Sequence, residues 1–219
     1  MTDTLESRRA AAMVRSLGAL DPRIARAMEA VPRHRFVPPE LRSSAYEDEP
    51  VPLRESGSTV SAPHMVAIQL EAADLAPGLS VLEVGSGSGY LLALIAELVG
   101  PSGRVLGIEI EPSLVVTSRE TLRSLGYGAT VSVRAGDGIE GAPDLAPFDR
   151  ILVSCAVGEI APAWRAQLAP DGRIVAPLGG PFRHRLVTVD REGRRLQNGP
   201  ECRFVPLRGP RDPIYRPAI

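Results

Sequence analysis

Lysine is absent from this chain of 219 residues, in which all 25 basic residues are arginine. The absence excludes a Schiff-base lysine, a pyridoxal-phosphate anchor and the lysine of a phosphate-binding P-loop. Acidic residues number 26, so the formal net charge is -1 and the pI is about 6.3. Since nucleic-acid binding normally needs a strong positive field, we expect no nucleic acid among the partners.

Cysteine is scarce, and its spacing is as informative as its number. Cys155 and Cys202 are the only two, and neither belongs to a CxxC pair. The sequence therefore argues against a disulfide scaffold, a zinc ribbon and a thioredoxin motif, and no metal site is expected. It favours a reducing, cytoplasmic setting.

Long apolar runs are also missing. No run approaches the roughly 20 residues that span a bilayer, and residues 1–14 lack the apolar stretch of a secretory signal. Neither export nor a membrane partner is expected. With 44% hydrophobic and 23% charged residues, the composition is that of an ordinary globular protein, which we expect to form a single domain over 1–219 and a monomer.

Residues 1–78 are predicted to form an N-terminal helical segment that ends in a loop. One helix runs to about Leu17, and Asp21-Pro22 begins a second as its cap and first-turn proline, with an end near Val31-Pro32. The proline-rich stretch from Val37 to Pro52 comes next. We expect it to be a connector that lies on the surface.

Residues 79–208 alternate apolar runs with helical patterns, and the tail 209–219 is expected to be poorly ordered. Alternation of this kind predicts an α/β fold with a doubly wound, mostly parallel sheet. The final run follows a polar turn, Arg191–Pro200, which predicts an antiparallel end. The strands are expected at Ser80–Val84, Arg104–Ile108, Thr130–Arg134, Arg150–Ser154, Arg173–Ala176, Arg185–Val189 and Glu201–Val205, and the helices at about Gly89–Val99, Pro112–Leu125 and Ile160–Leu168.

The strongest local signal is the glycine loop Gly85-Ser86-Gly87-Ser88-Gly89, which joins the first strand of this region to a helix. Its glycines permit a tight turn and close backbone approach, and the helix N-terminus offers unpaired N–H groups to a ligand. The next strand ends at Glu109, where a doubly wound fold presents a carboxylate to ribose hydroxyls. Glu111 is the alternative, although it also fits the first turn of a helix.

A glycine loop alone would suit a nicotinamide or flavin dinucleotide or S-adenosylmethionine. The GxGxG spacing, the carboxylate of Glu83 before the loop, and Asp137-Gly138 after the third strand favour S-adenosylmethionine, whose sulfonium is attracted by a nearby carboxylate. Asp137 would accept from the adenine amino group, or it simply forms an Asp-Gly turn. The predicted cofactor-binding residues are Glu83, Gly85, Ser86, Gly87, Gly89, Glu109, Asp137 and Gly138.

Further segments narrow the prediction to one family. VPRHRFVP at 31–38 and STVSAPHM at 58–65 are the specific marks, and Gly136-Asp137-Gly138, Phe148–Ile151 and Arg203–Leu207 follow in matching order. Together with the glycine loop they resemble the protein-L-isoaspartate O-methyltransferases, a class I S-adenosylmethionine-dependent family. The resemblance covers roughly residues 7–209 and implies a Rossmann-like methyltransferase fold.

The resemblance implies methyl transfer to the α-carboxylate of L-isoaspartyl residues in damaged proteins or peptides, with S-adenosyl-L-homocysteine as product and repair through a succinimide. It implies that Ser61 is the catalytic hydroxyl near that carboxylate. Because His64 lies three residues later, it could share a helical face with Ser61 and activate it. The carboxylate is already ionised at neutral pH, however, so the chemistry needs positioning rather than a base. The implied substrate-binding residues are Thr59, Val60, His64, Val205, Pro206 and Leu207.

The sequence leaves three alternatives open. A relative could methylate a normal aspartate of a precursor peptide and so install an aspartimide. A nicotinamide-dependent oxidoreductase would also use a glycine loop, although with GxGxxG spacing. The third alternative is a module that binds the cofactor without catalysis.

Overall fold

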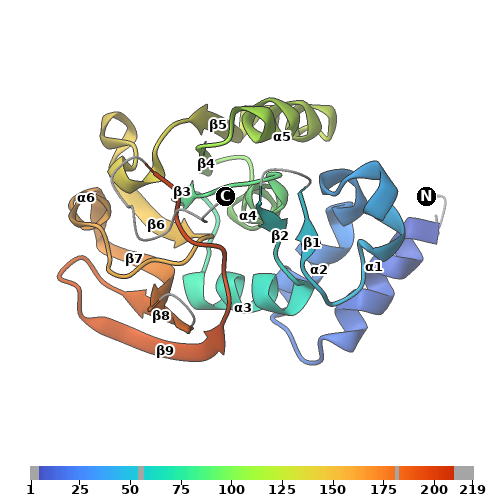
Figure 1. Cartoon of the computed structure of the whole chain (residues 1–219), viewed down its shortest axis with the longest axis horizontal. Helices are drawn as coiled ribbons and strands as arrows, with labels where there is room; N and C mark the ends of the chain where they lie inside the picture. The colour runs from blue at the N-terminus through green and yellow to red at the C-terminus, as the bar shows by residue number, and fades with distance from the viewer. Residues whose placement is uncertain (1–4, 54–56, 181–182, 210–219) are drawn as a thin grey trace.

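The structure is a computed structural model that describes residues 5–53, 57–180 and 183–209 (Figure 1). An α/β part lies beside an N-terminal helical part, and helix α3 lies between them (Figure 1). In the described residues, no helix is long and apolar enough to cross a membrane.

The N-terminal part contains α1 (Leu5–Ser16) and α2 (Pro22–Ala30), as the sequence predicted. Asp21 caps α2, since its Oδ1 accepts a hydrogen bond from the backbone N–H of Arg23 at 2.7 Å. Met28 of α2 is fully buried in a hydrophobic cluster that includes residues of α3 and α4. The helical segment is therefore packed against the α/β part rather than tethered to it.

The prediction that Val37 to Pro52 lies on the surface is wrong in part. The segment includes the 3-10 helix η2 (Pro39–Ser44), the 3-10 helix η1 (Arg33–Phe36) precedes it, and Val37, Ala45 and Val51 are buried at 5%, 0% and 4% exposure. These side chains belong to the same cluster as α2 and α4. Prolines limit regular structure, but scattered apolar side chains still drive the segment into the core.

The main sheet of the described chain has seven strands in the order β5-β4-β3-β6-β7-β8-β9. The strands β5, β4, β3, β6 and β7 are parallel, whereas β8 and β9 run antiparallel to their neighbours. The predicted α/β fold with an antiparallel end is confirmed. The strands are β3 (Ser80–Val84), β4 (Arg104–Glu109), β5 (Val131–Ala135), β6 (Phe148–Val153), β7 (Leu168–Gly179), β8 (His184–Val189) and β9 (Arg195–Cys202).

The last strand was expected at Glu201–Val205, and this prediction is wrong because β9 begins six residues earlier, at Arg195. Asp190 closes a short turn into it by accepting from the backbone N–H of Arg194 at 2.8 Å. β9 is an exposed edge strand, so it lacks the apolar pattern that identifies a buried one. The chain after β9 crosses back over the sheet, where Pro206 forms an isolated parallel bridge with Ala156.

Helices cover both faces of the sheet, and each face has its own hydrophobic cluster. Val81 of β3 packs in the cluster with α3 and α4, whereas Leu82 and Val84 pack in the cluster with Trp164 of α6. A separate pair of short strands precedes α3. These elements are α3 (Pro63–Ala73), α4 (Tyr90–Val99), α5 (Pro112–Ser124), α6 (Pro162–Ala166), β1 (Val51–Pro52) and β2 (Thr59–Val60).

Close packing of α4 on β4 requires glycine at position 107. A Cβ there would lie 2.6 Å from Leu92 Cδ1 and 2.8 Å from Ser86 Cβ. We expect Gly107→Ala to lower the free energy of unfolding by about 2 kcal/mol in urea titrations, because the buried side chain of Leu92 and Ser86 of the glycine loop must shift. Gly128→Ala is the control, since its nearest contact would be Arg123 Cγ at 3.8 Å. Equal losses in the two variants would contradict the close approach of α4.

Candidate functional site

The glycine loop lies at the carboxyl ends of the parallel strands β3 and β4. The backbone N–H groups of Gly85 and Ser86 donate to the carbonyl of Ile108 at 2.9 and 3.1 Å, which ties the loop to β4. Gly85, Gly87 and Gly89 have φ values of +76°, +53° and +86°. Residues other than glycine rarely adopt these backbone conformations, so the predicted need for glycine is confirmed at all three positions.

Glu109 at the end of β4 holds the same loop through its carboxylate. Its Oε2 accepts from the N–H of Gly87 at 2.7 Å, its Oε1 accepts from the N–H of Glu111 at 2.9 Å, and the side chain is buried. Glu109 lines a cavity together with Gly85, whereas Glu111 accepts from the hydroxyl of Ser113 and lines a separate groove on the outer side of the loop. Of the two predicted alternatives, the geometry favours Glu109.

Three cavities meet around this edge of the sheet. The cofactor-side cavity lies among the glycine loop, Glu109, Gly138 and residues Val205 to Arg208. The substrate-side cavity, of about 410 Å³, extends from Ser61 toward β9. The inner cavity lies beneath the glycine loop, between Ser61 and Tyr90. Thr59 and Ser154 line all three cavities, so these two residues mark their junction.

The predicted substrate residues are brought to this junction from two distant segments. Ser61 follows β2 and lines both the substrate-side and the inner cavity, and Val60 lines the inner cavity. Val205 lines both the substrate-side and the cofactor-side cavity. Pro206 and Leu207 line the cofactor-side cavity and not the substrate-side one. Their predicted contact with the substrate stays a prediction.

The expectation that Ser61 and His64 share a helical face is wrong. Helix α3 begins at Pro63 with Ala62 as its N-cap, so Ser61 lies outside it. The Nδ1 of His64 is 2.9 Å from Oδ1 of Asp48, and the imidazole is half exposed. The same carboxylate oxygen accepts from the backbone N–H of His64, so Asp48 caps α3 and pairs with the imidazole, which lines the substrate-side cavity together with Ser61.

Glu83 of β3 is a buried carboxyl beside the inner cavity. Its Oε1 accepts from the hydroxyl of Ser154 at 2.7 Å, while its Oε2 is buried without a hydrogen-bond partner in the described residues. Burial raises the pKa of Glu83 to about 8, and the nearby charge of Glu109 adds to the rise, although the bond from Ser154 opposes it. A pKa of about 8 favours the protonated, neutral carboxyl at pH 7.

Asp137 is held in a turn. Its Oδ1 accepts from the N–H of Ile139 at 3.0 Å, which caps the 3-10 helix η5 (Gly138–Glu140). Gly138 lines the cofactor-side cavity, and a Cβ there would lie 2.5 Å from Val84 Cγ1. The turn is observed, and the contact of Asp137 with adenine stays a prediction.

Sequence reasoning missed Ser154, which belongs to no glycine motif. Its hydroxyl donates to Glu83 across two neighbouring strands, and it lines the three cavities. Its place at the end of the fourth predicted strand, Arg150–Ser154, was the only available signal, because the carboxyl ends of parallel strands form the site in open α/β sheets.

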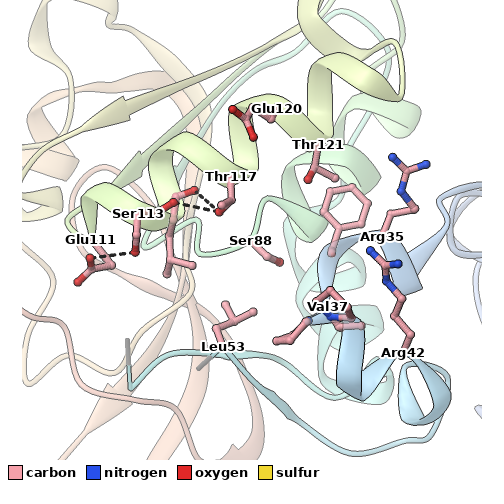
Figure 2. Close-up of a pocket in the computed structure, with 14 residues that line it drawn as sticks. Arg35, Val37, Arg42, Leu53, Ser88, Glu111, Ser113, Thr117, Glu120 and Thr121 are labelled. Carbon is pink, nitrogen blue, oxygen red and sulfur yellow. Dashed lines mark hydrogen bonds between the residues drawn. The ribbon is translucent and has the colours of Figure 1, made fainter. Parts of the chain in front are cut away.

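A larger groove of about 980 Å³ lies on the outer side of the glycine loop (Figure 2). Arg35 and Arg42 lie on its N-terminal wall, and Glu111 and Thr117 lie on the wall formed by α5, with Ser88 of the loop between the walls (Figure 2). The groove is therefore lined by charges of both signs and does not contain the predicted substrate residues.

The pKa of Glu83 has a consequence for stability. An unfolded glutamate ionises near 4.5, whereas the folded protein keeps Glu83 protonated to about pH 8. The unfolded state therefore binds fewer protons between these values, and wild-type stability falls as pH rises through this window. We expect Glu83→Gln to gain on the order of 5 kcal/mol relative to wild type between about pH 4.5 and 8, measured by urea unfolding. Parallel stability curves for wild type and Glu83→Gln across this pH window would contradict the buried neutral carboxyl.

Comparisons with known proteins identify a family for this chain. A family model for protein-L-isoaspartate(D-aspartate) O-methyltransferase matches residues 9–212. A protein-L-isoaspartate O-methyltransferase from Methanopyrus kandleri is 47% identical over 201 residues, which cover 90% of this chain and 88% of the relative. A solved protein-L-isoaspartate O-methyltransferase structure aligns with a TM-score of 0.82 and 28% identity, over 93% of this chain and 66% of that longer chain.

A second solved structure has the same fold. It is a Plasmodium falciparum protein described as a protein-L-isoaspartate O-methyltransferase, crystallised in complex with S-adenosyl-L-homocysteine. It aligns with a TM-score of 0.80 and 24% identity, over 91% of this chain and 98% of that chain. On the family match and the identity to its relatives, this chain belongs to the protein-L-isoaspartate(D-aspartate) O-methyltransferase family.

Proposed function

We propose that this protein transfers the methyl group of S-adenosylmethionine to the α-carboxylate of L-isoaspartyl residues in damaged proteins or peptides, which leads to repair through a succinimide. The observation that carries the proposal is the meeting of the cavities: Thr59, Ser61 and Ser154 line both the inner cavity beside the glycine loop and the substrate-side cavity. Family membership supports the same reaction. The name shared by the relatives favours repair over the tailoring of a precursor peptide.

The inner and cofactor-side cavities, of about 40 and 50 Å³, hold only part of the cofactor, and the polar atoms of the inner cavity suit its amino-acid end. Glu83 Oε2 and Ser86 Oγ are both buried without a hydrogen-bond partner in the described residues, although buried polar atoms are normally satisfied. A cofactor with an ammonium, a carboxylate and a sulfonium supplies such partners, and Glu83 then becomes the counter-charge of the cationic end. When bound, S-adenosylmethionine supplies an electrophilic methyl group. The N–H groups in the first turn of α4, where Tyr90 and Leu91 line the inner cavity, would hold its amino-acid end, and Glu109 its ribose.

The substrate side needs no strong base. An isoaspartyl α-carboxylate has a pKa near 4 and is ionised at neutral pH, so it is itself the nucleophile. In the proposed role, the Ser61 hydroxyl donates to one carboxylate oxygen and leaves the other directed at the methyl group. The products are a methyl ester and S-adenosyl-L-homocysteine. The next backbone amide then attacks the ester, methanol leaves and a succinimide forms.

A paired-peptide assay tests the proposed function. The protein is incubated with methyl-labelled S-adenosylmethionine and with two synthetic peptides that contain Asp or isoAsp at the same position. We expect base-labile label on the isoAsp peptide alone. Equal labelling of the Asp peptide would favour peptide tailoring. Calorimetric binding of S-adenosyl-L-homocysteine without any transfer would indicate a non-catalytic module, and binding of NADH instead would indicate an oxidoreductase.

The proposed role of Ser61 predicts a separation between turnover and cofactor affinity. Ser61→Ala should lower kcat about tenfold and leave the Kd for S-adenosyl-L-homocysteine nearly unchanged, because the hydroxyl positions the carboxylate only. His64→Ala is the matched comparison and should retain kcat within about twofold, since its Nδ1 is paired with Asp48. Kinetics with the isoAsp peptide measure both. Equal losses in the two variants would contradict positioning and restore base activation by His64.

A further inference from the structure

The side chain of Arg33 is the most deeply buried charge of the described chain, with 0% exposure. Its hydrogen bonds go to backbone carbonyls rather than to a carboxylate: Nε donates to Ala45 O, and Nη2 donates to Ser61 O, at 2.6 and 2.8 Å. Burial lowers the pKa of the guanidinium, and Tyr90 is the main group that opposes this effect. A buried charge without a paired carboxylate is costly, so its retention calls for a reason beyond stability.

The contacts of Arg33 join segments that are far apart in the sequence. Ser61 lies on the loop between β2 and α3, and Ala45 lies at the end of η2. The guanidinium also lies over the ring of Tyr90, with 4.8 Å between Cζ and the ring centroid. Tyr90 is the first residue of α4, directly after Gly89 of the glycine loop. One side chain thus touches both the predicted substrate segment and the end of the predicted cofactor loop.

The bond to Ser61 bears on the reaction because it fixes the backbone of a residue that lines two cavities. Nη2 of Arg33 lies 2.8 Å from the carbonyl oxygen of Ser61. This bond fixes the backbone from which the Ser61 hydroxyl projects, beside the substrate-side and inner cavities. Tyr90 is buried and also packs against Phe36, with ring centroids 5.6 Å apart, so the guanidinium lies on a rigid platform. Methyl transfer is sensitive to displacements of about 1 Å, because the nucleophile must approach in line with the leaving sulfur.

We propose that Arg33 is a positioning residue for methyl transfer, which sets the backbone of Ser61, and with it the bound carboxylate, against the glycine loop. The inference rests on the proposed function, since it needs Ser61 to contact the substrate. Arginine suits this role because its planar fork reaches two carbonyls while its face stacks on an aromatic ring. Lysine has a point charge and lacks that face, so it can replace arginine only in part.

The test uses Arg33→Met and Arg33→Lys, with Arg119→Met as the matched control. Arg119 also donates two hydrogen bonds to a backbone carbonyl, that of Val133, but lines none of the three cavities. For each variant we would measure thermal unfolding, the Kd for S-adenosyl-L-homocysteine, and kcat and KM with the isoAsp peptide. We expect Arg33→Met to lose at least about tenfold in kcat with a Kd within about threefold of wild type. The kcat of Arg33→Lys should lie between those of wild type and Arg33→Met, and Arg119→Met should retain the wild-type kcat.

A structural role alone would lower the unfolding temperature of Arg33→Met without lowering the kcat of the folded protein, and this result would overturn the inference. If Arg33→Met fails to fold, Arg33→Lys decides: a folded lysine variant with wild-type kcat overturns the inference, and a reduced kcat with unchanged Kd supports it. Absence of methyl transfer by the wild type would remove the proposed function and the inference together. Full activity of Arg33→Met removes the inference alone.

Discussion

The structure around the site depends on the attachment of the glycine loop to the carboxyl end of β4. The carbonyl of Ile108 accepts from Gly85 and Ser86, and the carboxylate of Glu109 accepts from Gly87. These bonds hold a loop whose glycines all have positive φ, a conformation that any other side chain would strain. The attachment leaves the N-terminal end of α4 open to a ligand and places it beside Glu83, Ser154 and the substrate segment.

The polar atoms around the inner cavity illustrate how a binding site conflicts with stability. A fold selected for stability alone would satisfy Glu83 and Ser86, yet each has a buried oxygen without a partner in the described residues. Burial raises the pKa of Glu83, and a protonated carboxyl avoids the larger cost of a buried negative charge. In the proposed complex the bound cofactor would complete these contacts, and the unsatisfied atoms would then contribute to the free energy of binding.

The N-terminal segment contributes to the site through its burial and not through a catalytic motif. Arg33 and Phe36 reach Tyr90 at the start of α4, and the same guanidinium holds the carbonyl of Ser61. Since Val37 and Ala45 pack in the cluster shared with α4, the segment is fixed to the α/β part along much of its length. A helical part that is peripheral in sequence thus becomes the support of the substrate side.

Local signals in the sequence predicted the alternating strands and helices, the helix cap at Asp21, the glycine loop and the carboxylate of Glu109 at the end of a strand. Each of these features depends on residues within one helix or strand, or on the rule that ligands bind at the carboxyl ends of the strands in a parallel sheet. The start of β9, the burial of Val37 and Ala45, the pairing of His64 with Asp48 and the junction at Ser154 were decided by the tertiary structure. An exposed edge strand has no apolar period, and a contact between distant segments leaves no local pattern, so only the packed chain determines which polar groups meet.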